Sequence, residues 1–147
     1  MKKILLMLSI VLTLFTSATG LAQQGQAQAT LPTITLSING VELSTEIAET
    51  GAQRFKGLSF RKTLAPNAGM LFVYPAEQQL TFTMRDTLLP LTIAYLSKDM
   101  VINEFHEMPV GPNQLFPSKK PAQFALEVNQ GWFEKNGIAV GDRVTLR

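Results

Sequence analysis

The chain has 147 residues, with 13 lysines and arginines, 11 aspartates and glutamates, one histidine and no cysteine. This length predicts a single domain. The lack of cysteine excludes disulfides, thiolate catalysis and cysteine-bound metals, and a single histidine excludes a zinc site built from several histidines.

Residues 1–22 have the pattern of a secretory signal peptide. The basic start MKK precedes an apolar run over residues 4–15, and Gly20 and Ala22 stand at the positions that signal peptidase reads. A membrane anchor is the alternative, but a span needs about 20 apolar residues and this run is shorter. We therefore expect a periplasmic or secreted bacterial protein with no membrane span after cleavage.

Cleavage of the signal would also change the charge balance. Lys2 and Lys3 would be lost, which leaves 11 basic residues against 11 acidic ones. Because binding of nucleic acid depends on a basic surface that contacts phosphates, we expect no nucleic-acid partner.

The first part of the mature chain combines a leader, a hairpin and a helix. Residues 23–32 are rich in Gln, Ala and Gly without periodicity, which predicts a flexible leader before one domain over residues 33–147. Alternating apolar residues around Asn39-Gly40 predict a hairpin with a type I′ turn. Thr50 and Gln53 have capping-box spacing, which predicts a short helix that ends near Gly57.

The rest of the chain is predicted to be mostly strand. The apolar run Met70 to Tyr74 predicts a central strand that ends at Pro75, because proline has no ladder donor. Further strands are predicted at 80–84, 92–97 and 101–107, then a long loop at 111–121, a strand within 122–132 that leads into a short helix near Phe133, and a last strand within 141–147. Seven or eight short strands with two short helices indicate a mostly-β (β-rich α+β) domain, either a sandwich or a partly open barrel.

Three stretches, "GLSFRKTLAPNAGMLFVY", "FTMRDTLLPLTIAYL" and "ALEVNQGWFEKNGIAVGD", resemble a bacterial and archaeal family known as domain of unknown function 192 (DUF192). Its pattern runs from G-L-M-x-R through G-M-L-F-x-F and F-W-M-x-N-T-x-x-P-L-D to L-E-V-x-x-G, and the resemblance covers residues 33–147. The positions that agree are Gly57, Leu58, Arg61, Gly69, Met70, Leu71, Phe72, Phe82, Met84, Thr87, Pro90, Leu91, Glu127 and Gly131. The resemblance implies a β-rich fold and frequent export, and it implies no biochemical activity.

Four positions depart from the family pattern. Ser59 replaces a methionine and Thr83 replaces a tryptophan. Asp86 replaces an asparagine, and Thr92 replaces an aspartate. If that aspartate serves a shared activity, the resemblance implies that this chain has lost or altered it.

Arg61, Asp86 and Thr87 are the first three candidates for a ligand-binding site. The guanidinium fork of Arg61 suits a carboxylate or phosphate, and the alternative is an internal ion pair with Glu127 or Asp86. Arg85, Asp86 and Thr87 follow an apolar strand. Either Arg85 and Asp86 reach a cleft and bind a polar ligand, or Asp86 or Thr87 binds backbone amides of the turn and Arg85 is a solvated neighbour.

Glu127 and Asn129 complete the candidate ligand-binding set. They share one face of a predicted strand with Ala125, about 7 Å apart per two residues. Two polar groups beside a small alanine suit the floor of a shallow pocket, and a solvated outer face of a sheet has the same pattern.

These observations favour a small non-enzymatic domain that binds a polar small molecule or an envelope partner, with no cofactor and no metal. The alternative is an enzyme that acts on an envelope saccharide or another polar substrate, with Asp86 or Glu127 as acid or base. A third interpretation is copper binding by His106, Met84 and Met108, although methionines in apolar strand patterns are more typical of core packing. The chain has no nucleophile elbow, P-loop or dinucleotide fingerprint.

Overall fold

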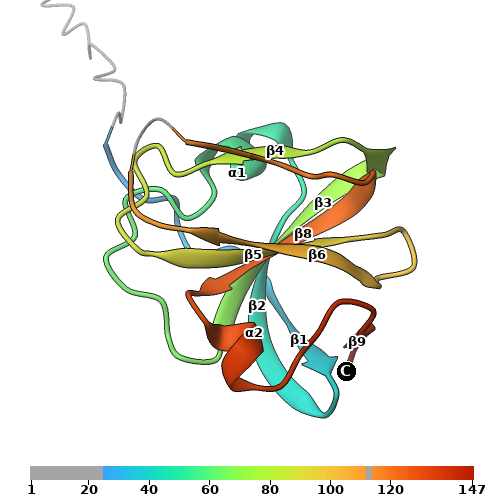
Figure 1. Ribbon diagram of the computed structural model, residues 1–147. Helices are drawn as coiled ribbons and strands as arrows, with labels where there is room; N and C mark the ends of the chain where they lie inside the picture. Colours follow the sequence, from blue (N-terminus) through green and yellow to red (C-terminus); the bar gives the residue numbers. More distant parts are fainter. Residues whose placement is uncertain (1–24, 112–113) are drawn as a thin grey trace, which may run out of the picture.

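A curled sheet of seven strands forms most of the domain, and a second sheet of two strands lies over it (Figure 1). The computed structural model describes residues 25–111 and 114–147, so the predicted signal peptide lies outside the described residues. The elements are β1 (Thr33–Ile38), β2 (Val41–Ala48), α1 (Gly51–Lys56), β3 (Ala68–Gln78), β4 (Thr81–Thr83), β5 (Leu91–Leu96), β6 (Ile102–Met108), β7 (Leu115–Pro117), β8 (Ala122–Asn129), α2 (Trp132–Lys135) and β9 (Val144–Leu146).

The large sheet has the strand order β6-β5-β8-β3-β2-β1-β9, and β4 pairs with β7 in the small sheet. The β2–β3 pair is parallel, whereas the other paired strands are antiparallel. A parallel pair needs a crossover connection, and α1 lies in that connection. The predicted mostly-β class and the partly open barrel are therefore confirmed, in the form of a half-barrel with a small second sheet.

Local sequence signals account for the first hairpin and for α1. Asn39 and Gly40 have φ values of 51° and 83°, as the two central residues of a type I′ turn require. At the start of α1, the Gln53 backbone N–H donates to Thr50 Oγ1 at 3.2 Å, and the Thr50 N–H donates to Gln53 Oε1 at 2.9 Å. These reciprocal bonds form the predicted capping box.

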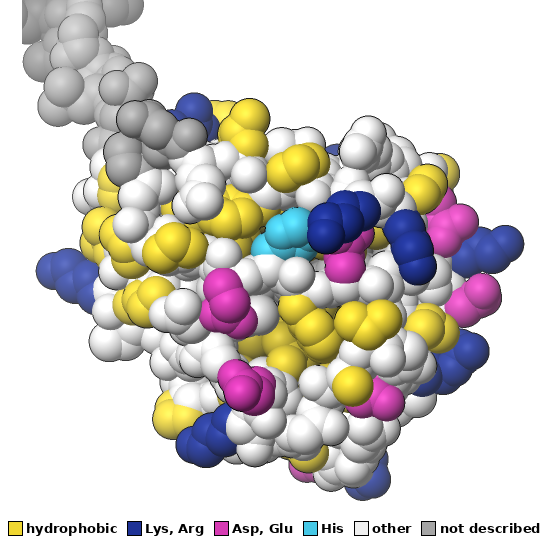
Figure 2. Space-filling view, viewed as in Figure 1, with side chains coloured by type: hydrophobic (Ala, Val, Ile, Leu, Met, Phe, Trp, Pro, Cys, Tyr) yellow, Lys and Arg dark blue, Asp and Glu magenta, His cyan; other side chains and the backbone are white. Residues whose placement is uncertain are grey.

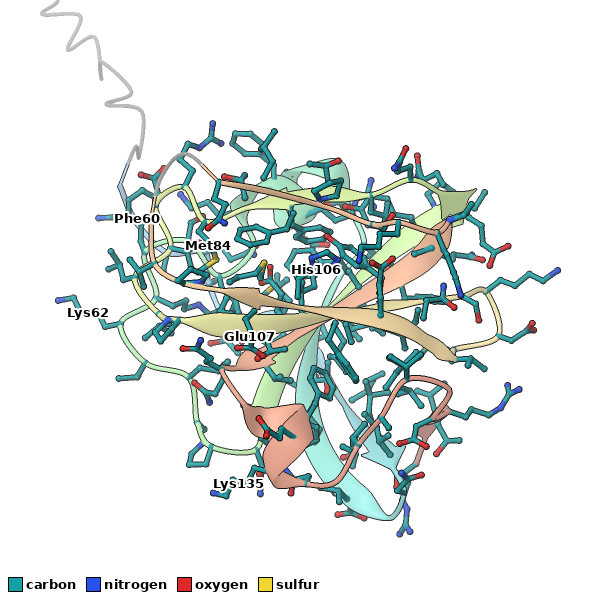
Figure 3. The ribbon with its side chains drawn as sticks, in the orientation of Figure 1. Phe60, Lys62, Met84, His106, Glu107 and Lys135 are labelled. Carbon is teal, nitrogen blue, oxygen red and sulfur yellow. The ribbon has the colours of Figure 1, made fainter. Side chains whose placement is uncertain are left out.

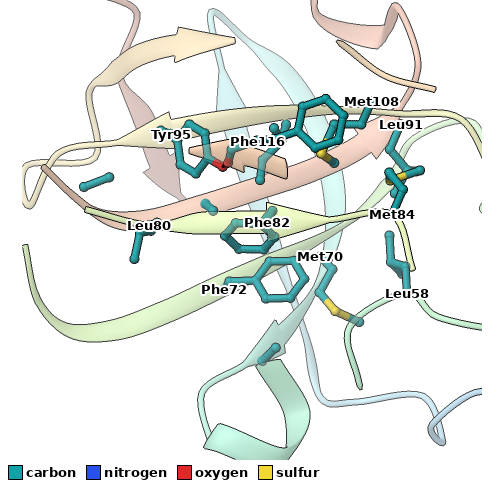
Figure 4. Packing of buried hydrophobic residues seen from close by; sticks show 14 residues of the cluster. Leu58, Met70, Phe72, Leu80, Phe82, Met84, Leu91, Tyr95, Met108 and Phe116 are labelled. Atoms are coloured by element: carbon teal, nitrogen blue, oxygen red, sulfur yellow. The ribbon is translucent and has the colours of Figure 1, made fainter. Parts of the chain in front are cut away.

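Apolar side chains cover both faces of the large sheet. The inner cluster lies between the curled sheet and the β4–β7 pair, and it includes Phe72, Phe82, Tyr95 and Phe116 (Figure 4). The outer cluster on the opposite face packs around Trp132 and its neighbours from α2, β1 and β9. Because side chains alternate along a strand, Ala125 and Glu127 of β8 face the inner cluster.

Two predictions from the sequence are wrong in detail. β3 continues past Pro75 to Gln78, and its register with β8 shifts between Val73 and Gln78. Pro75 therefore lies in an irregular stretch, where its missing N–H interrupts no regular ladder. The predicted loop at 111–121 contains the short strand β7, which only its pairing with β4 reveals.

The segment before β1 contacts the domain. Gln28 Nε2 donates to the carbonyl oxygens of Gln53 and Gly57 at 3.2 and 2.9 Å. The Leu31 N–H donates to Glu46 Oε2 at 2.8 Å, and its side chain packs on the inner cluster. In the described part of the chain, no helix is both long enough and apolar enough to cross a membrane.

Candidate functional site

A pocket of about 350 Å³ lies between α1 and β4, with β3 and β8 beneath it. We call it the α1–β4 pocket. Helix α1 and the residues after it form one wall, and β4 with the segment after it forms the other. Its lining residues are Arg54, Phe55, Lys56, Gly57, Leu58, Ser59, Phe72, Tyr74, Thr81, Phe82, Thr83, Arg85, Thr87 and Glu127.

Glu127 lies at the floor of this pocket, in the middle of the large sheet. Its register partners on the neighbouring strands are the apolar Met70 and Ile93. The residue is 5% exposed, and the structure gives its carboxyl group no hydrogen-bond partner among the described residues. Burial raises the pKa of the Glu127 carboxyl to about 8. At neutral pH the group is therefore mostly protonated and offers one O–H donor.

Three cationic side chains surround the pocket. Arg54 Nη1 donates to the Val73 carbonyl oxygen at 2.9 Å, and its guanidinium lies 4.7 Å from the centre of the Tyr74 ring. The guanidinium of Arg85 is half-exposed and lies 5.0 Å from the centre of the Phe55 ring. Lys56 is the third cation of the lining. Positive charge above a protonated acid suits a ligand that carries an anionic group.

Hydroxyl groups hold the backbone beside the pocket. The Arg85 N–H donates to Thr83 Oγ1 at 3.1 Å. The hydroxyls of Ser59 and Thr87 lie 3.4 and 3.5 Å from the Arg85 carbonyl oxygen, which they approach as donors. Thr87, a predicted site residue, is buried and is one of the residues that line the pocket.

Asp86 borders a neighbouring hollow of about 670 Å³, which shares Phe55, Lys56, Ser59 and Arg85 with the α1–β4 pocket. Its side chain is half-exposed, with Oδ2 3.8 Å from Arg85 Nε. The backbone at Asp86 has φ 59°, in the left-handed region that aspartate and asparagine tolerate better than most residues. Asp86 therefore suits this turn as well as the asparagine of the family pattern does.

Arg61 forms an internal ion pair, which was the alternative to ligand binding, but its partner differs from the two that were expected. Its Nη1 and Nη2 contact Glu46 Oε1 and Oε2 at 2.9 and 2.8 Å, so the partner is Glu46 and not Glu127 or Asp86. Both ends of the guanidinium fork are occupied by this carboxylate. Arg61 therefore holds the segment after α1 against β2, and it does not line the pocket.

Asn129 holds a loop. Its Nδ2 donates to the carbonyl oxygens of Leu64 and Ala65 at 3.1 and 3.0 Å. The residue borders a separate hollow beside Trp132. The five predicted site residues therefore do not share one pocket: Thr87 and Glu127 line it, Asp86 borders the next hollow, and Arg61 and Asn129 lie elsewhere.

Sequence reasoning considered Arg85 but did not identify Arg54, Lys56 or the β4 threonines as residues of the pocket. Arg54 and Lys56 reach it because α1 packs beside β4, which is a tertiary contact without a local signal. The alternation Thr81-Phe82-Thr83 was the one available signal, since it places two hydroxyls on the face opposite a buried phenylalanine.

Thr92, where the family pattern has aspartate, lies away from the pocket. Its Oγ1 donates to Glu107 Oε1 at 2.7 Å and accepts from the Gly131 N–H at 2.9 Å. Thr92 faces the outer side of the sheet, since its strand neighbours Leu91 and Ile93 belong to the inner cluster. This departure therefore leaves the α1–β4 pocket unchanged.

The residues suggested for copper do not gather at the surface. Met84 and Met108 are 2% and 0% exposed and pack in the inner cluster (Figure 4). His106 Nε2 lies 2.9 Å from Glu104 Oε2, and Figure 3 shows His106 and Glu107 on opposite sides of β6. Among the residues that the structure describes, no group of three or more His, Cys, Asp or Glu side chains is placed to hold a metal ion.

A family model named DUF192, with the description "Uncharacterized ACR", matches residues 34–146. The chain belongs to the DUF192 family. None of the curated proteins is significantly similar to it.

Two solved structures resemble this DUF192 domain. One is a protein from Sinorhizobium meliloti 1021 described as a candidate transcription regulator, with a TM-score of 0.76 and 26% identity over 81% of this chain and 97% of that one. The other is a protein of unknown function from Novosphingobium aromaticivorans, with a TM-score of 0.74 and 29% identity over 78% of this chain and 86% of that one. Both similarities extend over most of the domain.

Proposed function

We propose that this DUF192 protein is an exported, non-enzymatic domain that binds a polar ligand or envelope partner through an anionic group in the α1–β4 pocket. The observation that carries the proposal is Glu127, a buried carboxyl at the pocket floor without a hydrogen-bond partner among the described residues. Because Glu127 lines the pocket, its O–H can donate to a ligand there. A ligand that accepts this O–H would form a hydrogen bond at the pocket floor.

The surroundings of Glu127 favour a ligand that is both polar and negatively charged. Lys56 and Arg85 supply positive charge, while Phe72 and Phe82 supply apolar walls. Ligand sites commonly combine apolar walls with a few polar groups, in pockets of roughly 300–1,000 Å³. The α1–β4 pocket has this combination at about 350 Å³.

The proposal that the protein is exported is based on residues 1–22, which combine a basic start, an apolar run and small residues at the cleavage positions. In a bacterial host, we expect the full-length chain to appear in the periplasm or medium with a new N-terminus after Ala22. Fractionation followed by N-terminal sequencing checks this expectation. Uncleaved protein that stays in the cytoplasm would contradict it.

The description of the Sinorhizobium meliloti protein does not lead us to propose a nucleic-acid partner. After the proposed cleavage, 11 basic residues balance 11 acidic ones. On the face shown in Figure 2, the Lys and Arg side chains are dispersed among acidic ones. A surface that binds phosphates requires a concentration of positive charge.

Calorimetric titration of the purified protein against periplasmic glycans and small carboxylates or phosphates tests the proposal. We expect at least one anionic compound to bind, and Glu127→Gln and Arg85→Gln to weaken its binding. Arg147→Gln is the matched control, because Arg147 is as exposed as Arg85 but pairs with Glu42 on β2. Binding that both pocket variants leave unchanged would show that the pocket is not the site.

A single observation favours the enzyme alternative, in which the substrate is an envelope saccharide or another polar compound. A carboxyl with a pKa of about 8 could serve as a general acid near neutral pH. A glycosidase of the usual kind needs a second carboxylate, and Glu127 is the single carboxyl group among the lining residues of this pocket. Cleavage of an envelope glycan that disappears in Glu127→Gln would favour the enzyme.

A further inference from the structure

Strand β4 has one paired edge and one unpaired edge. Its partner is β7, and among the described residues the small sheet consists of these two strands. Just before β4, the Ser118 N–H donates to the Leu80 carbonyl oxygen at 2.8 Å and the Leu80 N–H donates to Ser118 Oγ at 3.0 Å, so both backbone groups of Leu80 point toward the chain of β7. Hydrogen-bonded and non-hydrogen-bonded pairs alternate in an antiparallel ladder. Phe82 therefore bonds to β7.

The backbone groups of Thr81 and Thr83 consequently point away from β7. Pro117 lies opposite Thr81 and has no N–H, as a non-hydrogen-bonded position allows. Within residues 25–111 and 114–147, the structure gives the N–H and C=O groups of Thr81 and Thr83 no hydrogen bond outside the ladder. The outer edge of β4 thus offers two N–H and two C=O groups.

The α1–β4 pocket runs along this unpaired edge. The side chain of Phe82 lies on one face of β4, in the inner cluster, and those of Thr81 and Thr83 lie on the exposed face. All three residues line the pocket, whereas no residue of β7 does. Because the pocket contacts both faces of β4 but no residue of β7, it lies beside the open edge of β4.

The charge of the pocket limits the kind of ligand that it can bind. Lys56 and Arg85 border the space, and the single acidic group in its lining, Glu127, is largely neutral at pH 7 because burial raises its pKa to about 8. A peptide with acidic side chains complements this lining. A saccharide could supply the charge, but it has no row of alternating N–H and C=O groups to match the strand edge.

We propose that the α1–β4 pocket takes an extended acidic peptide segment, which adds as a third strand along the open edge of β4. This inference rests on the proposed function and specifies its ligand. The added strand would lie about 4.8 Å from β4 and bond to Thr81 and Thr83, which are about 7 Å apart along the strand. Its acidic side chains would contact Lys56 and Arg85, and the Glu127 O–H would donate to an oxygen of the peptide.

The test uses the acetylated and amidated hexapeptide Asp-Thr-Glu-Thr-Asp-Thr as its probe. A version with the acids replaced by lysine reverses the charge, and a version methylated at every peptide nitrogen keeps the charge but has no backbone donors. We expect the acidic peptide to bind the purified protein at low salt, and both other peptides to bind at least about tenfold more weakly.

Two proline variants separate strand addition from simple charge attraction. Thr83→Pro removes a donor on the open edge of β4 and keeps the ladder to β7, so binding should weaken at least about fivefold. Leu115→Pro is the matched control, because Leu115 pairs with Thr83 and its N–H points away from β4. Circular dichroism checks that both variants fold, and the methylated peptide provides the same test without any substitution.

Each result has a definite meaning. Weaker binding to Thr83→Pro alone, together with weak binding of the methylated peptide, would support strand addition. Equal binding of the methylated and unmethylated peptides would overturn it. If an acidic oligosaccharide binds the pocket and the peptide does not bind at about 1 mM, this inference fails and the proposed function stands. If neither ligand binds, both proposals fail.

Discussion

Glu127 and Arg61 represent two ways of placing an ionisable side chain inside a small domain. Arg61 keeps its charge, because Glu46 meets both ends of its guanidinium at 2.9 and 2.8 Å. Glu127 instead lies between Met70 and Ile93, and burial favours its neutral form. The paired residue is structural, whereas the unpaired one is the stronger candidate for function.

The raised pKa of Glu127 predicts a pH-dependent stability. Its folded pKa is about 8 against an ordinary value of 4.5, so the folded state binds more protons between these values and Glu127 lowers stability as pH rises. Glu127→Gln should match the wild type near pH 4 and exceed it by about 3 kcal/mol near pH 7. Urea unfolding at several pH values measures this difference, and parallel pH profiles for the two proteins would contradict it.

The buried pair predicts a large effect at Arg61. Arg61→Ala would leave the buried Glu46 carboxylate without its cation, with the Leu31 N–H as its remaining partner, and should lower the free energy of unfolding by about 3 kcal/mol. The matched control is Arg147→Ala, which breaks an exposed pair with Glu42 and should cost less than about 1 kcal/mol. Denaturant titration compares the variants, and equal losses would show that the Arg61 pair is not the stronger one.

At the scale of elements, local chemistry was predictable and distant pairing was not. The turn at Asn39-Gly40 and the capping box of Thr50 and Gln53 follow from residues a few positions apart, and the structure contains both. β7 lies 32 residues or more from its partner β4 and has three residues, one of them Pro117, so nothing local distinguishes it from a loop. The pocket depends on the β4–β7 pair and could not be predicted without it.

Close packing of β3 on β8 predicts the effect of a single methyl group. A Cβ at Gly69 would lie 2.7 Å from the Glu127 backbone oxygen and 3.1 Å from Val128 Cγ1. Gly69→Ala should therefore force the strands apart beneath the pocket and cost about 1–3 kcal/mol. Gly51→Ala, at the start of α1 with nothing within 4 Å, is the control and should be neutral or stabilising. Thermal unfolding compares the two, and a harmless Gly69→Ala would refute this packing argument.

At the scale of the whole molecule, a curled sheet is closed on its inner side by two short strands and a short helix. The class of fold was predictable because strand patterns and turn residues recur along the chain. The five predicted site residues were chosen by residue type and strand face, and Thr87 and Glu127 were the two that line the pocket. Arg61 and Asn129 lie elsewhere because their partners, Glu46 and the carbonyl groups of Leu64 and Ala65, come from distant parts of the sequence.

The most direct test of the central claim is to map amide chemical shifts by NMR while an anionic ligand is titrated into the purified protein. If the α1–β4 pocket is the binding site, the largest shifts will occur at Lys56, Thr83, Arg85 and Glu127. Shifts confined to the hollow around Trp132, or spread evenly over exposed lysines and arginines, would contradict the claim.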